Sequence, residues 1–175
     1  MDDHTDKLIV NGPAKLGGRV RISPAKNAYL PIVAGALLSS SRVVLKNVPD
    51  LSDIRTMLII LETLGVKVAS QNGTHNLVLE VSALNSYEVS IDSVTTSIRA
   101  LILLLGPLLG RFGRAKLPLP GGCKIGQRPI DIHVSGLHKL GARIDITGGY
   151  IHAETQKLCG ATLKLRYPSV GATEN

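Results

Sequence analysis

LETLGVKV at residues 61–68 and LHKLGARI at residues 137–144 are two copies of one pattern. An aspartate opens the apolar run that leads into each copy, Asp53 in the first and Asp131 in the second. Apolar residues three and four apart indicate a helix, and the glycine is typical of a helix end. Recurrence at a fixed spacing indicates a repeated supersecondary unit. The sequence therefore predicts helix, glycine stop and strand, twice.

The residues around each copy extend the repeat to strand, helix, strand, helix, strand, strand. Ser52 is the expected N-cap of the first amphipathic helix. A second helix, at residues 97–109, is apolar nearly all round, so we expect it at the centre of a domain. The resulting fold class is α/β. The predicted strands lie at residues 19–22, 66–69, 76–81, 143–146 and 150–153, and the predicted small-residue helices at residues 27–40 and 97–109.

A third copy begins near the C-terminus. Residues 161–165 read as its first strand, and residues 171–175 stand where its apolar helix would start. A repeat unit buries its apolar face against its neighbours, so an architecture cut at this point would expose core surface. We therefore expect the chain to be a fragment of a longer protein.

Composition favours a globular protein of the reducing cytoplasm. The 175 residues are 44% hydrophobic, but no apolar run approaches the roughly 18 residues of a membrane span, so no membrane association is expected. The N-terminus lacks the features of a signal peptide, and two cysteines make no disulfide framework. The net charge of +7 suits anionic small ligands. Scattered cations and 3% aromatic residues argue against nucleic acid as a partner.

The second copy contains a loop that the first lacks. From Pro49 to Asp53 is four steps and from Pro120 to Asp131 is eleven, so the second copy carries seven more residues. Cys123 lies among them in a glycine-rich setting, beside Lys124 and five residues before Arg128. Nearby cations lower a thiol pKa and make it a usable acid or nucleophile. Cys123 is therefore a candidate catalytic residue, whereas Cys159 has no such company and is interpreted as structural.

Five other positions are candidates for which a structural role is also open. Lys26 and Asn27 open a predicted helix, where a lysine and backbone N–H groups can bind phosphate, but Asn27 could also be a cap. Arg99 interrupts an apolar helix and needs a ligand, a partner or access to water. Asp131 could bind a ligand or cap its helix, as Asp53 could in the first copy. His133 has no partner that the sequence reveals.

These residues resemble those of a known family. The SPAKNA motif at residues 23–28, the LPLPGGCKIGQRPID loop at residues 117–131 and the PSVGAT motif at residues 168–173 closely resemble the enolpyruvyl transferases, within them the branch that uses UDP-N-acetylglucosamine. The resemblance implies an inside-out α/β barrel of βαβαββ units, here truncated in the third unit. It further implies that residues 1–22 belong to the other domain of the full-length protein and that residues 23–175 form an incomplete domain.

The resemblance also implies a reaction. The enolpyruvyl group of phosphoenolpyruvate would move to the 3-hydroxyl of UDP-N-acetylglucosamine with release of phosphate, which commits the sugar to peptidoglycan synthesis and so links the protein to cell-wall biogenesis, cell shape, cell division and the cell cycle. It implies no metal and no cofactor. The implied catalytic residues are Cys123 as proton donor, Lys26 and Arg128, and the implied substrate-binding residues are Lys26, Asn27, Arg99, Arg128, Pro129, Ile130, Asp131, Ile132, Tyr167, Pro168, Ser169 and Val170.

The sequence departs from the family pattern at two positions, and two other functions stay open. Thr96 stands where a lysine is frequent, and Tyr167 replaces a residue that is often basic. The family's general base and further arginines come from a later portion of the chain, so little turnover is expected from these residues without that portion as a partner. One alternative is a transferase that acts on shikimate 3-phosphate, although that branch does not rely on the cysteine loop. The other is a non-catalytic module that binds nucleotide sugars.

Overall fold

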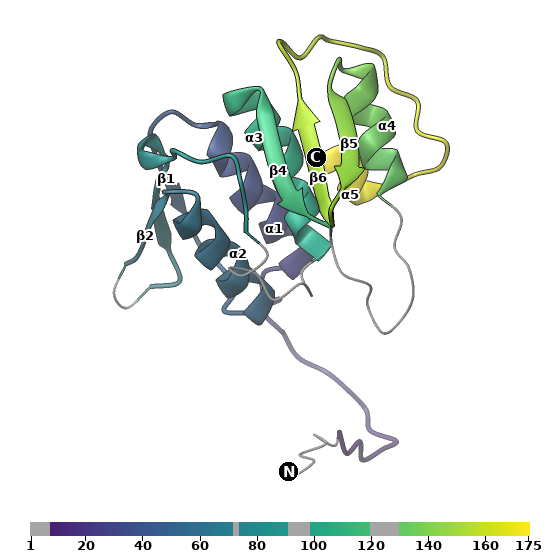
Figure 1. Ribbon diagram of the computed structural model, residues 1–175. Coiled ribbons are helices and arrows are strands. Elements are labelled where there is room, and N and C mark those ends of the chain that lie inside the picture. The colour runs from purple at the N-terminus through teal and green to yellow at the C-terminus, as the bar shows by residue number, and fades with distance from the viewer. Residues whose placement is uncertain (1–7, 72–73, 91–98, 120–129) are drawn as a thin grey trace, which may run out of the picture.

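Two three-stranded antiparallel sheets enclose a layer of helices (Figure 1). The computed structural model describes residues 8–71, 74–90, 99–119 and 130–175. The first unit consists of α1 (Lys26–Gly35), η1 (Ala36–Leu38), β1 (Arg42–Leu45), α2 (Ser52–Thr63), β2 (Lys67–Ser70), β3 (Leu77–Glu80) and η2 (Val81–Ala83). The rest consists of η4 (Arg99–Leu104), α3 (Leu105–Phe112), β4 (Arg114–Pro118), α4 (Asp131–Lys139), β5 (Arg143–Thr147), β6 (Tyr150–Glu154) and α5 (Val170–Glu174).

The two sheets have the same topology, which confirms the repeat. Their strand orders are β1-β3-β2 and β4-β6-β5, and in each the last strand in sequence lies in the middle. Beside β4, Glu88 forms a parallel bridge with Lys116, and the N–H of Val89 donates to the Lys116 carbonyl at 2.9 Å. The helices η4 and α3 connect these two parallel segments. The second unit therefore has the predicted order, with an isolated bridge at Glu88 in the place of its first strand.

One apolar core joins the two units. The predicted central helix is buried, with Leu104, Leu105 and Leu108 all at 0% exposure, and it packs on α1 and β4. It differs from the prediction in running to Phe112 and in opening as the 3-10 helix η4. Pro107 lies in the first turn of α3, where its missing N–H removes no intrahelical bond. This arrangement fixes the start of η4 next to α1 and α4 next to β5.

Glycine ends both repeated helices, as predicted. Gly65 has φ +97° and Gly141 has φ +94°, a conformation that other residues rarely adopt. The N–H of Val66 donates to the Leu61 carbonyl, and the N–H of Ala142 donates to the Leu137 carbonyl, each at 3.0 Å. These are the bonds of the Schellman motif, so the same device turns the chain from helix to strand in both units.

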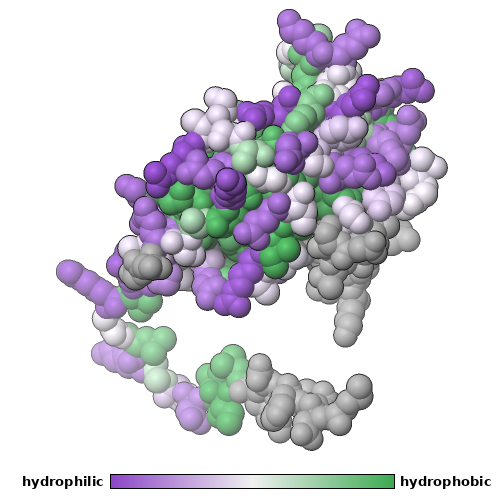
Figure 2. Space-filling model, turned by 60° about the vertical axis from the view of Figure 1, so that its left-hand side comes forward, coloured by the Kyte–Doolittle hydropathy of each residue, from purple (hydrophilic) through white to green (hydrophobic). Residues whose placement is uncertain are grey.

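Three predictions of local structure were wrong. Ser52 is the first residue of α2 and not its cap, because Leu51 occupies the N-cap position and no side chain caps the helix. Residues 19–22 form no strand; they belong to an extended arm, residues 8–25, in which Val20 is 84% exposed (Figures 1 and 2). Residues 161–165 form no strand either. A strand needs a partner, and no described segment pairs with either of these two.

Candidate functional site

The structure brings together two parts of the predicted site. One part is residues 130–132 at the start of α4, and the other is residues 167–170, where α5 begins. Ile130, Asp131 and Ile132 stand at the start of α4, and α5 packs against this helix. Cys123, Arg128 and Pro129, together with Thr96, lie outside the described residues. The predictions for these four residues stay predictions.

Asp131 makes an ion pair with Arg166, a residue that sequence reasoning missed. Asp131 is the first residue of α4 and caps nothing, since Ile130 holds the N-cap position without a side-chain bond. Its negative charge is nevertheless favourable in the first helical turn, where backbone N–H groups point outward. Arg166 also lies over the ring of Tyr167, 5.4 Å from the ring centroid to the guanidinium carbon. The Arg166 guanidinium thus contacts both the Asp131 carboxylate and the Tyr167 ring.

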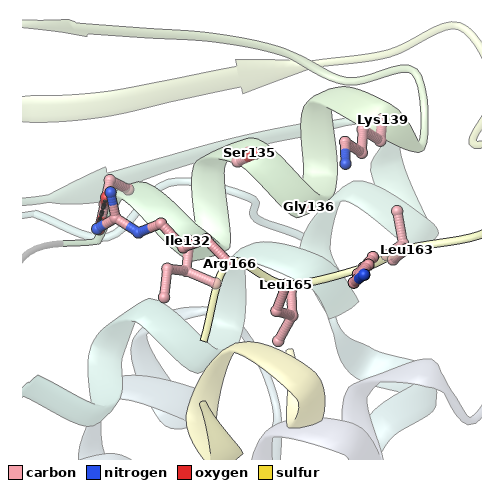
Figure 3. Close-up of a pocket in the computed structure, with 9 residues that line it drawn as sticks. Ile132, Ser135, Gly136, Lys139, Leu163, Leu165 and Arg166 are labelled. Carbon is pink, nitrogen blue, oxygen red and sulfur yellow. Dashed lines mark ion pairs between the residues drawn. The ribbon is translucent and has the colours of Figure 1, made fainter. Parts of the chain in front are cut away.

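A cavity of about 370 Å³ lies between α4 and residues 163–166 (Figure 3). Asp131 and Ile132, both predicted to bind substrate, are part of its wall. Figure 3 shows Arg166 toward one end and Lys139 toward the other, with Leu165 between them. The lining residues are Asp131, Ile132, Ser135, Gly136, Lys139, Leu163, Lys164, Leu165 and Arg166. Three cations against one carboxylate make the wall positive, so the cavity suits an anionic ligand with an apolar part.

The segment Tyr167–Val170 ends where α5 begins. Ser169 is the N-cap of α5, and its Oγ accepts a hydrogen bond from the Ala172 N–H at 3.4 Å. Tyr167 and Val170 are 49% and 75% exposed. These two side chains therefore face solvent, while the backbone at the start of α5 is held by the cap.

Lys26 is a second part of the predicted site, at the start of α1. Its Nζ lies 2.7 Å from Oδ2 of Asp53, which belongs to the first turn of α2. Asn27 is exposed in the same turn of α1 and caps nothing, because the N-cap position is Ala25. Both aspartates of the repeat thus hold a cation, Asp53 that of Lys26 and Asp131 that of Arg166.

Arg99 opens η4 and is exposed. No ion pair involves it within the described part of the chain. Its charge acts on His133, whose pKa is lowered mainly by burial and further by Arg99, while Asp131 opposes the shift. His133 is 5% exposed, and its Nδ1 lies 3.0 Å from Nδ2 of Asn175, a partner that the sequence did not reveal.

Three further features bear on the class of protein. The described ranges contain no group of three or more His, Cys, Asp or Glu side chains that could hold a metal ion. None of the helices in those ranges has the length and apolar character that a membrane crossing requires. Cys159, interpreted as structural, is an exposed free thiol whose backbone N–H donates to the Leu140 carbonyl at 2.8 Å.

Comparison with known proteins gives the family. A family model described as EPSP synthase (3-phosphoshikimate 1-carboxyvinyltransferase) matches residues 10–175. The chain belongs to this family of enolpyruvyl transferases. The UDP-N-acetylglucosamine 1-carboxyvinyltransferase 2 of Carboxydothermus hydrogenoformans is 49% identical over 170 residues, which cover 97% of this chain and 40% of that protein. The corresponding enzyme of Hydrogenovibrio crunogenus is 47% identical over the same shares.

A solved enolpyruvyl transferase has a similar fold. NikO from Streptomyces tendae superimposes with a TM-score of 0.67 at 24% identity, over 85% of this chain and 32% of that one. The resemblance to the enolpyruvyl transferases is thereby confirmed at the level of family and α/β fold. This chain spans about 40% of the length of the curated relatives it matches.

Proposed function

We propose that this chain supplies the UDP-N-acetylglucosamine side, and part of the phosphoenolpyruvate side, of an enolpyruvyl transferase. The reaction moves the enolpyruvyl group to the 3-hydroxyl of the sugar and releases phosphate. The observation that supports this proposal most strongly is sequence identity: over 97% of its length the chain is 44–49% identical to proteins named for this activity. In this role the protein acts in the cytoplasm at the first committed step of peptidoglycan synthesis, and so in cell-wall biogenesis, cell shape and cell division.

The cavity beside α4 supports the sugar-nucleotide part of the proposal. Its wall contains Asp131 and Ile132, and its three cations suit the diphosphate of UDP-N-acetylglucosamine. Its volume lies within the range of small-molecule sites, about 300–1,000 Å³. Arg166 can exchange Asp131 for a phosphate at small cost, because solvent-exposed ion pairs contribute only about 0–1 kcal/mol. Tyr167 and Val170 are exposed next to it and would contact the same ligand.

Lys26, Arg99 and Arg128 form the phosphoenolpyruvate part in this proposal. The ion pair of Lys26 with Asp53 is exposed, so an anionic substrate can replace Asp53 as the partner of Lys26. Arg99 makes no ion pair among the described residues, so its charge can also bind an anionic substrate. Cys123 would give a proton to the methylene carbon while the sugar 3-hydroxyl gives its proton to the general base and its oxygen bonds to the neighbouring carbon. Loss of phosphate together with a proton from the former methylene carbon then forms the double bond of the product enol ether. Cations around two anionic substrates stabilise the charge that develops along this path.

The domain organisation belongs to the same proposal. Residues 23–175 would form most of one inside-out α/β barrel, and residues 1–22 would pair with the other domain. The exposed apolar side chains of the arm support the second point, with Leu16 91% and Ile22 83% exposed. A general base and further arginines would come from the portion of the relatives that this chain does not match. The 175 residues alone are then expected to bind substrate without multiple turnovers.

The test is a fusion of residues 1–175 to the portion of the Carboxydothermus relative that this chain does not match. We expect phosphate release that requires both phosphoenolpyruvate and UDP-N-acetylglucosamine, and that falls by about a thousandfold or more in a Cys123→Ser variant, as is usual when a general acid is lost together with its positioning. A Cys159→Ser variant is the matched control and should keep its rate. An unaltered rate in Cys123→Ser would contradict the proposal.

A second substrate is favoured by the name of the matching family model, 3-phosphoshikimate 1-carboxyvinyltransferase. The same fusion separates the two functions. Phosphate release with shikimate 3-phosphate in place of the sugar nucleotide would favour a transferase that acts on shikimate 3-phosphate. Binding of UDP-N-acetylglucosamine with no turnover in the folded fusion would instead favour the non-catalytic module.

A further inference from the structure

A partly buried hydrogen-bond network connects α4, η4, α3 and the residue that directly follows α5. The side chain of Asn175 is its centre: Oδ1 accepts from the Gly106 N–H at 2.9 Å, and Nδ2 donates to the Ile102 carbonyl at 3.1 Å. Nδ2 also lies 3.0 Å from Nδ1 of His133, which is 5% exposed. Three parts of the chain therefore meet at one amide.

These contacts fix the protonation state of His133. The Gly106 N–H can only donate, so the amide oxygen of Asn175 must face it and the amide nitrogen must face His133. An amide nitrogen also only donates, so Nδ1 of His133 has to accept and carries no proton. His133 is therefore the neutral tautomer with its proton on Nε2. Protonation of Nδ1 would set two donors against each other and break the bond.

The surroundings of His133 disfavour the charged form. Burial is the main cause of its lowered pKa, and Arg99 on η4 adds to the effect. Asp131 on α4 opposes it, but Arg166 holds that carboxylate in an ion pair. On α5 the charged residue is Glu174, which is exposed to solvent. The neutral state that the geometry requires is thus the state that the local charges favour.

The network attaches α5 to the elements around it. Among the described residues its N-cap Ser169 bonds only within the segment. The side chain of Asn175, directly after α5, is therefore what attaches it to α3, η4 and α4 by hydrogen bonds. When α5 is held, the segment Tyr167–Val170, which ends at its first residue, is held as well.

We propose that His133 is a positioning residue: through Asn175 it holds α5, and with it Tyr167–Val170, and it does so only while Nδ1 is unprotonated. The segment is then released as the pH falls through the titration of His133. The link from this release to sugar-nucleotide binding rests on the proposed function. The attachment of α5 does not.

The direct test is nuclear magnetic resonance of the 175-residue chain without ligand. Imidazole 15N shifts report the tautomer of His133, and 13Cα shifts of residues 171–174 report helix in α5. We expect the Nε2–H tautomer at neutral pH and a loss of helical shifts in α5 that follows the protonation of His133. A proton on Nδ1, or α5 shifts that stay constant while His133 titrates, would overturn the proposal.

Substitutions give an independent measure. His133→Asn keeps an acceptor near the place of Nδ1 and does not titrate, so α5 should stay helical and lose its pH dependence. His133→Leu removes the acceptor and should reduce the helical shifts of α5 at neutral pH. His138→Asn is the control, since Nδ1 of His138 lies 2.8 Å from the Ala142 carbonyl and touches no residue of α5. Equal α5 shifts in His133→Leu and the wild type would overturn the proposal; if that variant does not fold, the wild-type titration decides.

The consequence for binding is tested with UDP-N-acetylglucosamine as the probe. Its affinity for the wild type should fall by about tenfold, or 1.4 kcal/mol, once His133 is protonated, and it should not fall in His133→Asn. An equal fall in both chains would contradict the positioning role. Failure to bind at any pH would count against the proposed function and leave the attachment of α5 to be judged by the ligand-free titration.

Discussion

At the residue scale, two ion pairs at helix starts hold cations close to solvent. Lys26 lies against Asp53 and Arg166 against Asp131, and the two aspartates occupy equivalent places in the repeat. All four side chains are between 37% and 62% exposed, so their pairing contributes little to stability. Water and an arriving anion can compete for each cation. The pairs therefore orient the charges without locking them.

Arg166→Gln should weaken UDP-N-acetylglucosamine binding by about tenfold, because a charge-assisted bond to phosphate contributes roughly 1.5–3 kcal/mol, part of which the glutamine retains. Isothermal titration calorimetry on the 175-residue chain measures the change. Arg143→Gln is the control: Arg143 lies 3.5 Å from Asp145 on β5 and does not line the cavity. Equal affinities of the Arg166 variant and the wild type would remove Arg166 from the site.

The lowered pKa of His133 predicts how stability depends on pH. Below its ordinary value of 6.5 the unfolded chain takes up a proton at this position while the folded chain does not. The free energy of unfolding should therefore fall as the pH drops from 6.5 toward the lowered pKa, and this contribution should level off below it. Urea unfolding across this range measures it. The slope should be smaller in His133→Asn, and a slope unchanged by that substitution would show that other groups account for it.

At the element scale, the Schellman ends set the two repeated helix-to-strand turns, but their surroundings differ. A Cβ on Gly65 would lie 2.6 Å from Oδ1 of Asn85 and 2.8 Å from the Ala83 carbonyl oxygen. A Cβ on Gly141 would meet only the Lys157 carbonyl oxygen, at an ordinary 3.5 Å. The first turn is thus closed in by the end of η2 and by Asn85 after it, and the second has room.

Gly65→Ala should cost about 2 kcal/mol or more, from positive φ and the close approach together, whereas Gly141→Ala should cost about 1 kcal/mol from φ alone. Urea unfolding with unchanged m-values gives both numbers. Equal losses in the two variants would mean that the close contacts at Gly65 relax without cost.

The elements also show what a sequence can predict. Helix, glycine stop and hairpin follow from local pattern, and the observed strands β2, β3, β5 and β6 lie within one residue of the predicted ones at each end. Residues 19–22 and 161–165 alternate like strands but form none, because pairing depends on a neighbour that local pattern does not supply. Ser52 failed as a cap because the turn into α2 ends one residue earlier, at Leu51.

At the scale of the whole molecule, the repeat predicted the architecture but not the site contacts. The spacing of the copies indicated a repeated unit, and the structure has two units with the same strand order that share one core. Asp131 with Arg166 and His133 with Asn175 join residues far apart in sequence, the second pair 42 positions apart. No local pattern marks such pairs. Asp131 could be chosen from sequence as a candidate, whereas Arg166, its partner, could not.

The measurement that tests the account most directly is a titration of the 15N-labelled 175-residue chain with UDP-N-acetylglucosamine, followed by amide shifts. The account predicts saturable changes at residues 130–132 and 166–170 around the cavity beside α4, and no comparable changes with shikimate 3-phosphate. Changes confined to other parts of the chain, or a response to shikimate 3-phosphate alone, would contradict the claim that this cavity belongs to a sugar-nucleotide site.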